Sequence, residues 1–99
     1  LVMLESKIER KVSEHAKKCG MNHYKFTSPA QRGVPDSIYL FNGYCFFIEF
    51  KQAGKKPRKL QQAKIAQIVK QGFDVFIVDD IAMGILIINN IVDKHAKQK

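Results

Sequence analysis

The feature that most constrains this chain is the dipeptide Asn42-Gly43, which stands between two strongly apolar segments. Asn-Gly in this setting is the strongest short-range sign of a β-hairpin, because both residues accept the positive φ angles of a two-residue turn. The flanking segments 37–41 and 44–51 are rich in aromatic and β-branched side chains, which are typical of strands. A two-residue turn also fixes the register, so Phe41 is predicted to face Tyr44.

The same register, followed outward, brings three charged residues together. Ser37 faces Ile48, and one step further Asp36 falls opposite Glu49. Directly opposed residues share a face of the sheet, with Cβ atoms about 4.5–5.5 Å apart. Lys51 lies two residues after Glu49 and joins that face, while Phe50 between them points away. The hairpin therefore predicts a cluster of Asp, Glu and Lys.

Two opposed carboxylates repel each other unless a cation lies between them. Mg²⁺ suits that place, because it commonly takes one or two carboxylates and completes its shell with water and phosphate oxygen. Lys51 beside it could orient an attacking water and stabilise charge that grows on a phosphate. The alternative is a salt-bridge cluster at a frayed hairpin end. We favour the metal site because Asp36 opposes Glu49 and a basic segment follows.

The remaining sequence predicts a single α/β domain, residues 1–99. Apolar residues at helical spacing predict helices over residues 3–19 and 60–71, each closed by a glycine. Further strands are predicted at 24–27, 73–78 and 85–88, with a loop at 28–35. The order α-β-β-β-α-β-β corresponds to a mixed sheet flanked by helices, since central strands that are apolar on both faces need helices on both sides.

The chain is strongly basic, with 17 Lys and Arg against 9 Asp and Glu and a net charge of +8. Such a surplus favours polyanions such as nucleic acid. Lys55, Lys56, Arg58 and Lys59 follow Lys51 directly, where they could track a phosphate backbone, although a solvated loop is the alternative. Arg32, shortly before Asp36, is a further candidate phosphate contact. No base-reading motif is visible, so we expect recognition of DNA shape.

The cysteines and histidines show no pattern of a zinc-binding or disulfide-rich protein. Cys19 and Cys45 are far apart, and the three histidines show no zinc-ligand spacing. Free thiols suit a reducing compartment, so we expect a cytoplasmic location. The apolar runs are too short or too interrupted to span a bilayer, and we expect no membrane partner.

An ordered set of motifs now gives a resemblance. The chain resembles the virus-type replication-repair nuclease (VRR-NUC) domain of the PD-(D/E)XK nuclease superfamily. The matching motifs are Gly33-Val34-Pro35-Asp36 and Glu49-Phe50-Lys51, preceded by Lys25-Phe26 and Gln31-Arg32-Gly33, and followed by Gly54-Lys55-Lys56-Pro57, Leu60-Gln61 and Gly72-Phe73-Asp74-Val75.

The resemblance implies that Asp36, Glu49 and the carbonyl of Phe50 hold Mg²⁺ or Mn²⁺, with Lys51 as the catalytic lysine. It also implies an acidic residue on the first helix and a glutamine on the second. The helical wheel aims Glu5 closer to the apolar face than Glu9, and both stay open.

Gln61 is the glutamine of the second helix that matches the resemblance. It shares a stripe with Ile65 and Ile68, so its amide needs a partner. That partner would be either the charged site or neighbouring backbone.

The resemblance further implies a phage-type DNA endonuclease that cuts branched DNA such as four-way (Holliday) junctions during repair. It implies a homodimer in a bacterial or phage-infected host cell. The alternative is a non-catalytic or sequence-blind nucleic-acid-binding module of the same fold. For the dimer surface we consider residues 81–92, which are too apolar for an exposed edge strand, although burial under the first helix would explain them equally.

Overall fold

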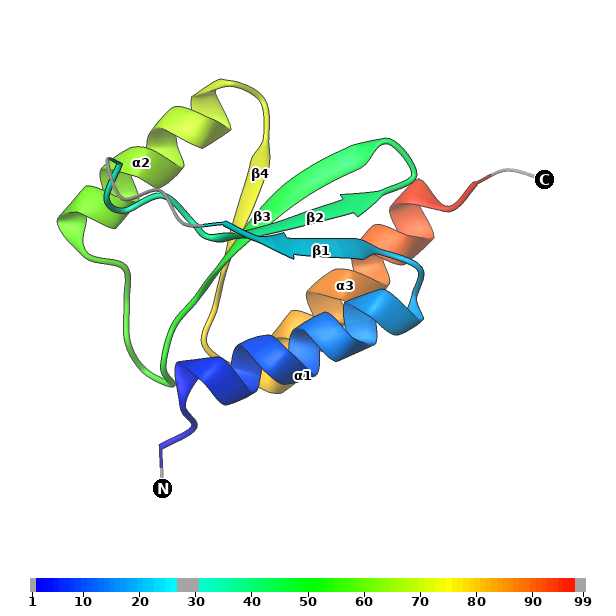
Figure 1. Cartoon of the computed structure of the whole chain (residues 1–99), viewed down its shortest axis with the longest axis horizontal. Coiled ribbons are helices and arrows are strands. Elements are labelled where there is room, and N and C mark those ends of the chain that lie inside the picture. The colour runs from blue at the N-terminus through cyan, green and yellow to red at the C-terminus, as the bar shows by residue number, and fades with distance from the viewer. Residues whose placement is uncertain (1, 27–30, 98–99) are drawn as a thin grey trace.

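The computed structural model describes residues 2–26 and 31–97. Figure 1 shows the elements along the chain, which are α1 (Glu5–Lys18), β1 (Asn22–Lys25), β2 (Ser37–Phe41), β3 (Tyr44–Phe50), α2 (Lys59–Lys70), β4 (Asp74–Val78) and α3 (Ile81–His95). The strands form one sheet in the order β1-β2-β3-β4, antiparallel except for the parallel pair β3–β4. The predicted α/β class, a mixed sheet flanked by helices, is confirmed. Within the predicted strand 24–27 and loop 28–35, residues 27–30 lie outside the described part.

The hairpin turn and its register agree with the prediction. Asn42 and Gly43 have φ angles of 48° and 85°, and the ladder runs from Phe41↔Tyr44 to Ser37↔Ile48. The described ladder stops at that pair. The carbonyl of Asp36 instead accepts a hydrogen bond from the Phe26 N–H at 3.1 Å. Asp36 thus lies just beyond the β2–β3 ladder and not within it.

Helices α1 and α3 pack side by side and cover one face of the sheet together (Figure 1). The core combines apolar side chains from both helices with the inward residues of β2, β3 and β4; its members include Ile8, Val12, Ala16, Tyr39, Phe46, Ile48, Val78, Ile88 and Ile91. Gly84 permits the close crossing of the two helices, because a Cβ there would overlap Val12. This packing anchors α1 beneath the strands that carry the charged residues.

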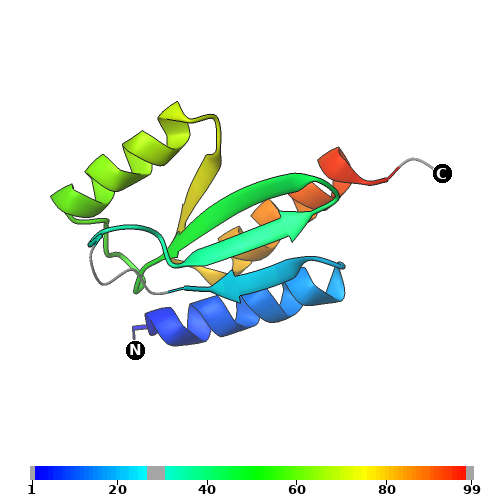
Figure 2. The same cartoon turned by 45° about the horizontal axis from the view of Figure 1, so that its top comes forward.

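The opposite face of the sheet is only partly covered. Helix α2 lies on that side near β4 (Figure 2) and contains no buried residue. Tyr24, Leu40 and Ile77 on this face remain 55%, 40% and 41% exposed. The expectation of helices on both faces therefore holds, but the second face keeps an open apolar surface.

The last predicted strand, residues 85–88, is wrong, because these residues lie within helix α3. The Asp80 carboxylate caps the helix by accepting a hydrogen bond from the Met83 N–H at 2.8 Å. Gly84, Ile88 and Ile91 are buried at a helical spacing. The β-branched side chains favoured a strand locally, but the cap and the 3.6-residue period decide for a helix. The apolar segment 81–92 is thus no edge strand, and most of its large side chains pack into the core.

Among the described residues, no helix combines the length and apolarity needed to cross a bilayer.

Candidate active site

Two of the three predicted charged residues, Asp36 and Glu49, meet in an acidic cleft at the end of the hairpin opposite its turn, and Lys51 lies beside it, with its Nζ 3.5 Å from Glu49 Oε2. The cleft encloses about 140 Å³, and its lining is Glu5, Ser6, Glu9, Lys25, Asp36, Glu49 and Phe50. These residues come from α1, the end of β1, the segment before β2, and the end of β3. The fold therefore brings Asp36, Glu49 and Phe50 together as predicted, and it adds both candidate glutamates of α1.

Glu49 is the electrostatic centre of the cleft. Its carboxylate shares the sheet face of Leu40 and Ile77, yet the residue is only 8% exposed. Burial raises the pKa of Glu49 above its ordinary value; Lys51 opposes this shift, and the carboxylates of Asp36 and Glu5 add to it. The surroundings thus disfavour the charged form of Glu49, and a bound cation would favour the carboxylate.

Gln61 connects three parts of the site. Its Oε1 accepts hydrogen bonds from Lys51 Nζ at 2.7 Å and from the Arg58 N–H at 2.9 Å. Its Nε2 donates to Glu49 Oε2 at 3.3 Å, and Lys51 Nζ lies 3.5 Å from the same oxygen. Both partners considered for this amide, the charged site and neighbouring backbone, are therefore present.

A glycine contact positions the first turn of α2 over the cleft. Gly33 has a φ of 85°, and a Cβ there would lie 3.0 Å from the Leu60 carbonyl oxygen. Glycine adopts this φ without steric cost and lets the segment before Asp36 touch the α2 backbone. Because Gln61 follows Leu60, this contact places its amide above Lys51 and Glu49.

The two glutamates of α1 differ in their partners. Glu9 Oε2 lies 3.0 Å from Lys25 Nζ, which in turn lies 3.9 Å from Asp36 Oδ2. Glu5 has no ion pair among the described residues, and its charge acts on Glu49. Lys25 was not predicted as a site residue. The sequence feature that points to it is the motif Lys25-Phe26, which matches the resembled family.

The basic segment begins directly beside the cleft. The Lys51 N–H donates to the Val78 carbonyl at 2.9 Å, and the Gly54 N–H donates to Asp79 Oδ2 at 3.2 Å, so β4 anchors the start of the segment. A second hollow, of about 430 Å³, is lined by Glu5, Lys51, Gln52, Lys55, Lys56 and Arg58. Glu5 borders both hollows, which makes them neighbours.

Lys59 and Arg32, the remaining predicted phosphate contacts, are less closely tied to the cleft. Lys59 is exposed at the first position of α2. Arg32 is exposed and makes no salt bridge or side-chain hydrogen bond to any other described residue.

The donor set of the cleft fits a hard divalent ion. Within residues 2–26 and 31–97, no three His, Cys, Asp or Glu side chains converge closely enough to form a metal cluster by themselves. Asp36, Glu49 and the Phe50 carbonyl offer oxygen donors only, which Mg²⁺ and Mn²⁺ prefer. Mg²⁺ in particular usually keeps several waters and needs few protein ligands. An ion bound there would favour the charged form of Glu49, which burial disfavours.

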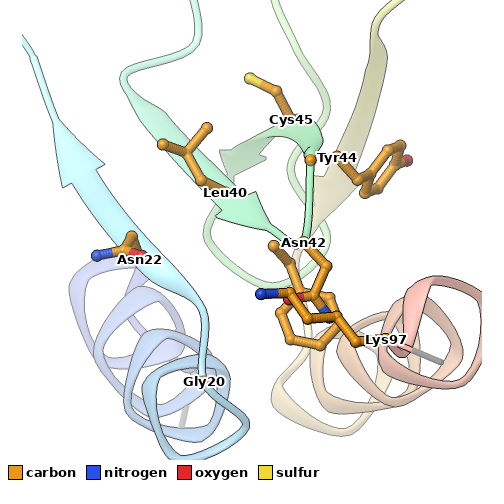
Figure 3. Close-up of a pocket in the computed structure, with 9 residues that line it drawn as sticks. Gly20, Asn22, Leu40, Asn42, Tyr44, Cys45 and Lys97 are labelled. Atoms are coloured by element: carbon orange, nitrogen blue, oxygen red, sulfur yellow. The ribbon is translucent and has the colours of Figure 1, made fainter. Parts of the chain in front are cut away.

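A separate hollow of about 500 Å³ lies at the turn end of the hairpin (Figure 3). It is lined by Gly20, Asn22, Leu40, Phe41, Asn42, Gly43, Tyr44, Cys45 and Lys97. No carboxylate or histidine lines it, so the acid–lysine chemistry of this chain gathers at the other end of the sheet.

Comparison with known proteins finds a similar sequence and a similar fold. No family model matches the sequence. The chain is 38% identical over 76 residues to "Putative nuclease p44" of Acyrthosiphon pisum secondary endosymbiont phage 1, which covers 76% of this chain and 82% of that protein. A solved structure described as a VRR_NUC domain has the same fold, with a TM-score of 0.77 over 94% of this chain and 97% of that chain, at 22% identity.

Proposed function

The chain belongs to the VRR-NUC family of nucleases, and on that premise we propose that it is a metal-dependent endonuclease of branched DNA, four-way junctions in particular. The observation that carries this proposal is that Asp36 and Glu49 line one acidic cleft, while Lys51, 3.5 Å from Glu49, lines the adjoining hollow with the basic segment. A carboxylate pair, a lysine and a path for phosphates are the parts that phosphodiester hydrolysis requires.

Each residue has a distinct role in this proposal. Asp36, Glu49 and the Phe50 carbonyl hold Mg²⁺ or Mn²⁺, and Glu5 completes the acidic wall. When bound, the ion supplies charge stabilisation at the phosphate and a more acidic water. Lys51, which contacts Glu49 from the adjoining hollow, stabilises charge on the phosphate oxygens. Gln61 fixes the Lys51 ammonium through the 2.7 Å hydrogen bond.

The basic segment supplies affinity for the DNA backbone. Lys55, Lys56 and Arg58 line the hollow next to Lys51, and their side chains are exposed. Phosphate contacts of this kind position DNA without reading its sequence. Lys59 and Arg32 are proposed to extend the contact on either side.

Cleavage of labelled DNA tests the proposal. Linear, flapped and four-way substrates are incubated with and without Mg²⁺ or Mn²⁺. Asp36→Ala and Glu49→Ala are expected to abolish cleavage while DNA binding persists. Lys51→Ala is expected to lose cleavage yet bind Mn²⁺ in calorimetry, because lysine is not a ligand for the ion. Wild-type protein that binds branched DNA but never cuts it would instead favour the non-catalytic binding module.

Neutralising the basic segment tests its role separately. A variant with Lys55, Lys56 and Lys59 changed to Gln should bind DNA more weakly and with a flatter salt dependence. Each lost phosphate contact lowers the log–log slope by about 0.9 on duplex DNA. An unchanged slope would show that these side chains are solvated and make no phosphate contacts.

We also propose that the active unit is a homodimer. A four-way junction offers two scissile strands related by an approximate two-fold axis, and one copy of the described cleft supplies one set of catalytic side chains. The open sheet face offers a surface for the second copy, since Leu40, Phe73 and Ile77 are 40%, 44% and 41% exposed there. Exposed apolar patches of this kind commonly mark interaction sites.

Light scattering at micromolar concentration tests the dimer. Wild-type protein should have twice the monomer mass, and Leu40→Glu with Ile77→Lys should shift it to monomer. Leu86→Glu is the matched control, because Leu86 is 59% exposed on α3, on the covered side of the sheet. A wild-type monomer that still cuts both strands of a junction would refute the dimer.

A further inference from the structure

Lys25 occupies a position in the acidic cleft that the proposed catalytic roles leave unexplained. It is the last residue of β1, and it lines the cleft together with four carboxylates, those of Glu5, Glu9, Asp36 and Glu49. Its ammonium lies 3.0 Å from Glu9 Oε2 and 3.9 Å from Asp36 Oδ2. A cation is thus already in place next to one of the two carboxylates that would hold the metal.

The two lysines of the site have different partners. Lys51 lines the neighbouring hollow, contacts Glu49 at 3.5 Å and donates to Gln61 at 2.7 Å. Lys25 lines the acidic cleft itself and contacts Glu9 and Asp36. The four carboxylates of the cleft outnumber these two lysines, so the region is net acidic and attracts a divalent ion.

Lys25 also has the freedom to move. Its side chain is 53% exposed, and a lysine stem carries its charge on several rotatable bonds. The shorter contact is with Glu9, so the ammonium can leave Asp36 and keep a carboxylate partner.

We propose that Lys25 is a built-in counter-ion of the cleft: it neutralises Asp36 while no divalent ion is bound and withdraws to Glu9 when one binds. The inference rests on the proposed metal site, and it names a regulator of affinity that is not itself a ligand. Because Lys25 and the ion compete for the same carboxylate, the lysine weakens metal binding and stabilises the metal-free protein.

A purely structural pair would also explain the contact between Lys25 and Glu9, since it ties β1 to α1. The two explanations differ in one observable. If Lys25 is only a structural tie, removing its charge leaves the metal affinity unchanged or lowers it. If Lys25 is a competing counter-ion, removing its charge raises the metal affinity.

Calorimetry with Mn²⁺ on the full chain separates them. Lys25→Met should bind Mn²⁺ about tenfold more tightly at low ionic strength, because the variant lacks a positive charge that repels the divalent ion. The gain should shrink as KCl is added, because salt screens exposed charges. Lys25→Arg keeps the charge and should bind within about twofold of wild type. Lys70→Met removes an exposed charge at the far end of α2 and is the matched control.

Thermal unfolding gives a second reading that does not depend on activity. Lys25→Met should melt below wild type without metal and gain more from saturating Mn²⁺. Lys25→Gln serves the same test if the methionine variant does not fold. Equal or weaker Mn²⁺ binding by the uncharged variants would overturn the counter-ion role and leave the nuclease proposal intact. Absence of Mn²⁺ binding in both wild type and variants would overturn the metal site and this inference with it.

Discussion

Replacing Gln61 with methionine is the sharpest test of how the catalytic lysine is positioned. Methionine is similar in length to glutamine but offers no hydrogen bond of comparable strength. The change removes the acceptor of Lys51 Nζ at 2.7 Å, the acceptor of the Arg58 N–H at 2.9 Å, and the donor to Glu49 at 3.3 Å.

The expected loss can be built from these three bonds. A hydrogen bond to a charged group contributes about 1.5–3 kcal/mol. Loss of a helix-capping acceptor costs about 0.5–2 kcal/mol. The third bond is long and adds little. Because the side chains are partly solvated, we take the lower ends and expect about 2 kcal/mol less unfolding free energy, which lowers Tm by about 10 °C in a domain of this size.

The effect on activity should exceed the effect on substrate binding. Without Gln61, Lys51 retains only Glu49 at 3.5 Å, so its ammonium samples several positions. A displacement of about 1 Å in a catalytic group can lower the rate about 100-fold. We expect a fall in kcat of about 10- to 100-fold, with Mn²⁺ affinity and KM for DNA nearly unchanged.

Gln62→Met is the matched control, because Gln62 is the next residue and its exposed side-chain amide donates to the Pro57 carbonyl at 2.9 Å, away from Lys51 and Glu49. It should change stability by less than about 0.5 kcal/mol. Differential scanning calorimetry and single-turnover cleavage measure both variants. Equal Tm and kcat for the two variants would refute the argument that α2 holds the catalytic lysine.

Three further changes probe the frame of the site. Gly33→Ala should lower the unfolding free energy by about 2 kcal/mol or more and lower kcat, because it adds both a strained φ and a contact with the α2 backbone. Gly72 is the control, because it has a φ of 96° and a Cβ there would meet nothing within 4 Å. Gly72→Ala should therefore lower the unfolding free energy only by the backbone strain of about 1–2 kcal/mol. Gly84→Ala should destabilise by about 1–3 kcal/mol, measured by urea unfolding, because the new methyl group meets Val12. Burial lowers the pKa of His23, so below about pH 6.5 the unfolded chain binds more protons than the folded protein, and stability falls with falling pH. His23→Gln should make Tm depend less on pH in thermal melts between pH 5 and 8. An unchanged slope of Tm against pH would contradict this role of His23.

The parts of the site that the sequence predicted are those fixed by local rules. The Asn42-Gly43 turn determines the strand register, and a strand alternates its side chains, so Glu49 and Lys51 had to share a face. Gln61 followed from the family resemblance, and helical periodicity agreed with it by placing the residue on the apolar stripe of the second helix. The prediction paired Asp36 with Glu49, because it assumed that the β2–β3 ladder continues to the cleft. In the structure the ladder ends at Ser37↔Ile48, and the Asp36 carbonyl accepts a hydrogen bond from the Phe26 N–H.

The parts that were missed depend on contacts between distant segments. The pairing of Lys25 with Glu9 requires α1 to lie across the end of β1, which no local pattern encodes. Helix α3 was taken for a strand because isoleucine-rich sequence favours strands in a short window. The sequence shows Asp80 and the helical spacing of Gly84, Ile88 and Ile91, and the structure shows that the cap and this spacing decide for a helix.

The two sides of the cleft also differ in how firmly the fold holds them. The acidic side rests on α1, whose buried residues pack into the core with α3. The lysine side depends on α2, which has no buried residue and reaches the cleft through the Gly33 contact and the bonds of Gln61. Segments with few buried contacts open at lower free energy than the core. Opening of α2 would therefore release Lys51 while Asp36 and Glu49 stay in place. The proposed metal site would persist in this open state, whereas the proposed catalytic site would not. Docking of α2 is thus the step that completes the catalytic site.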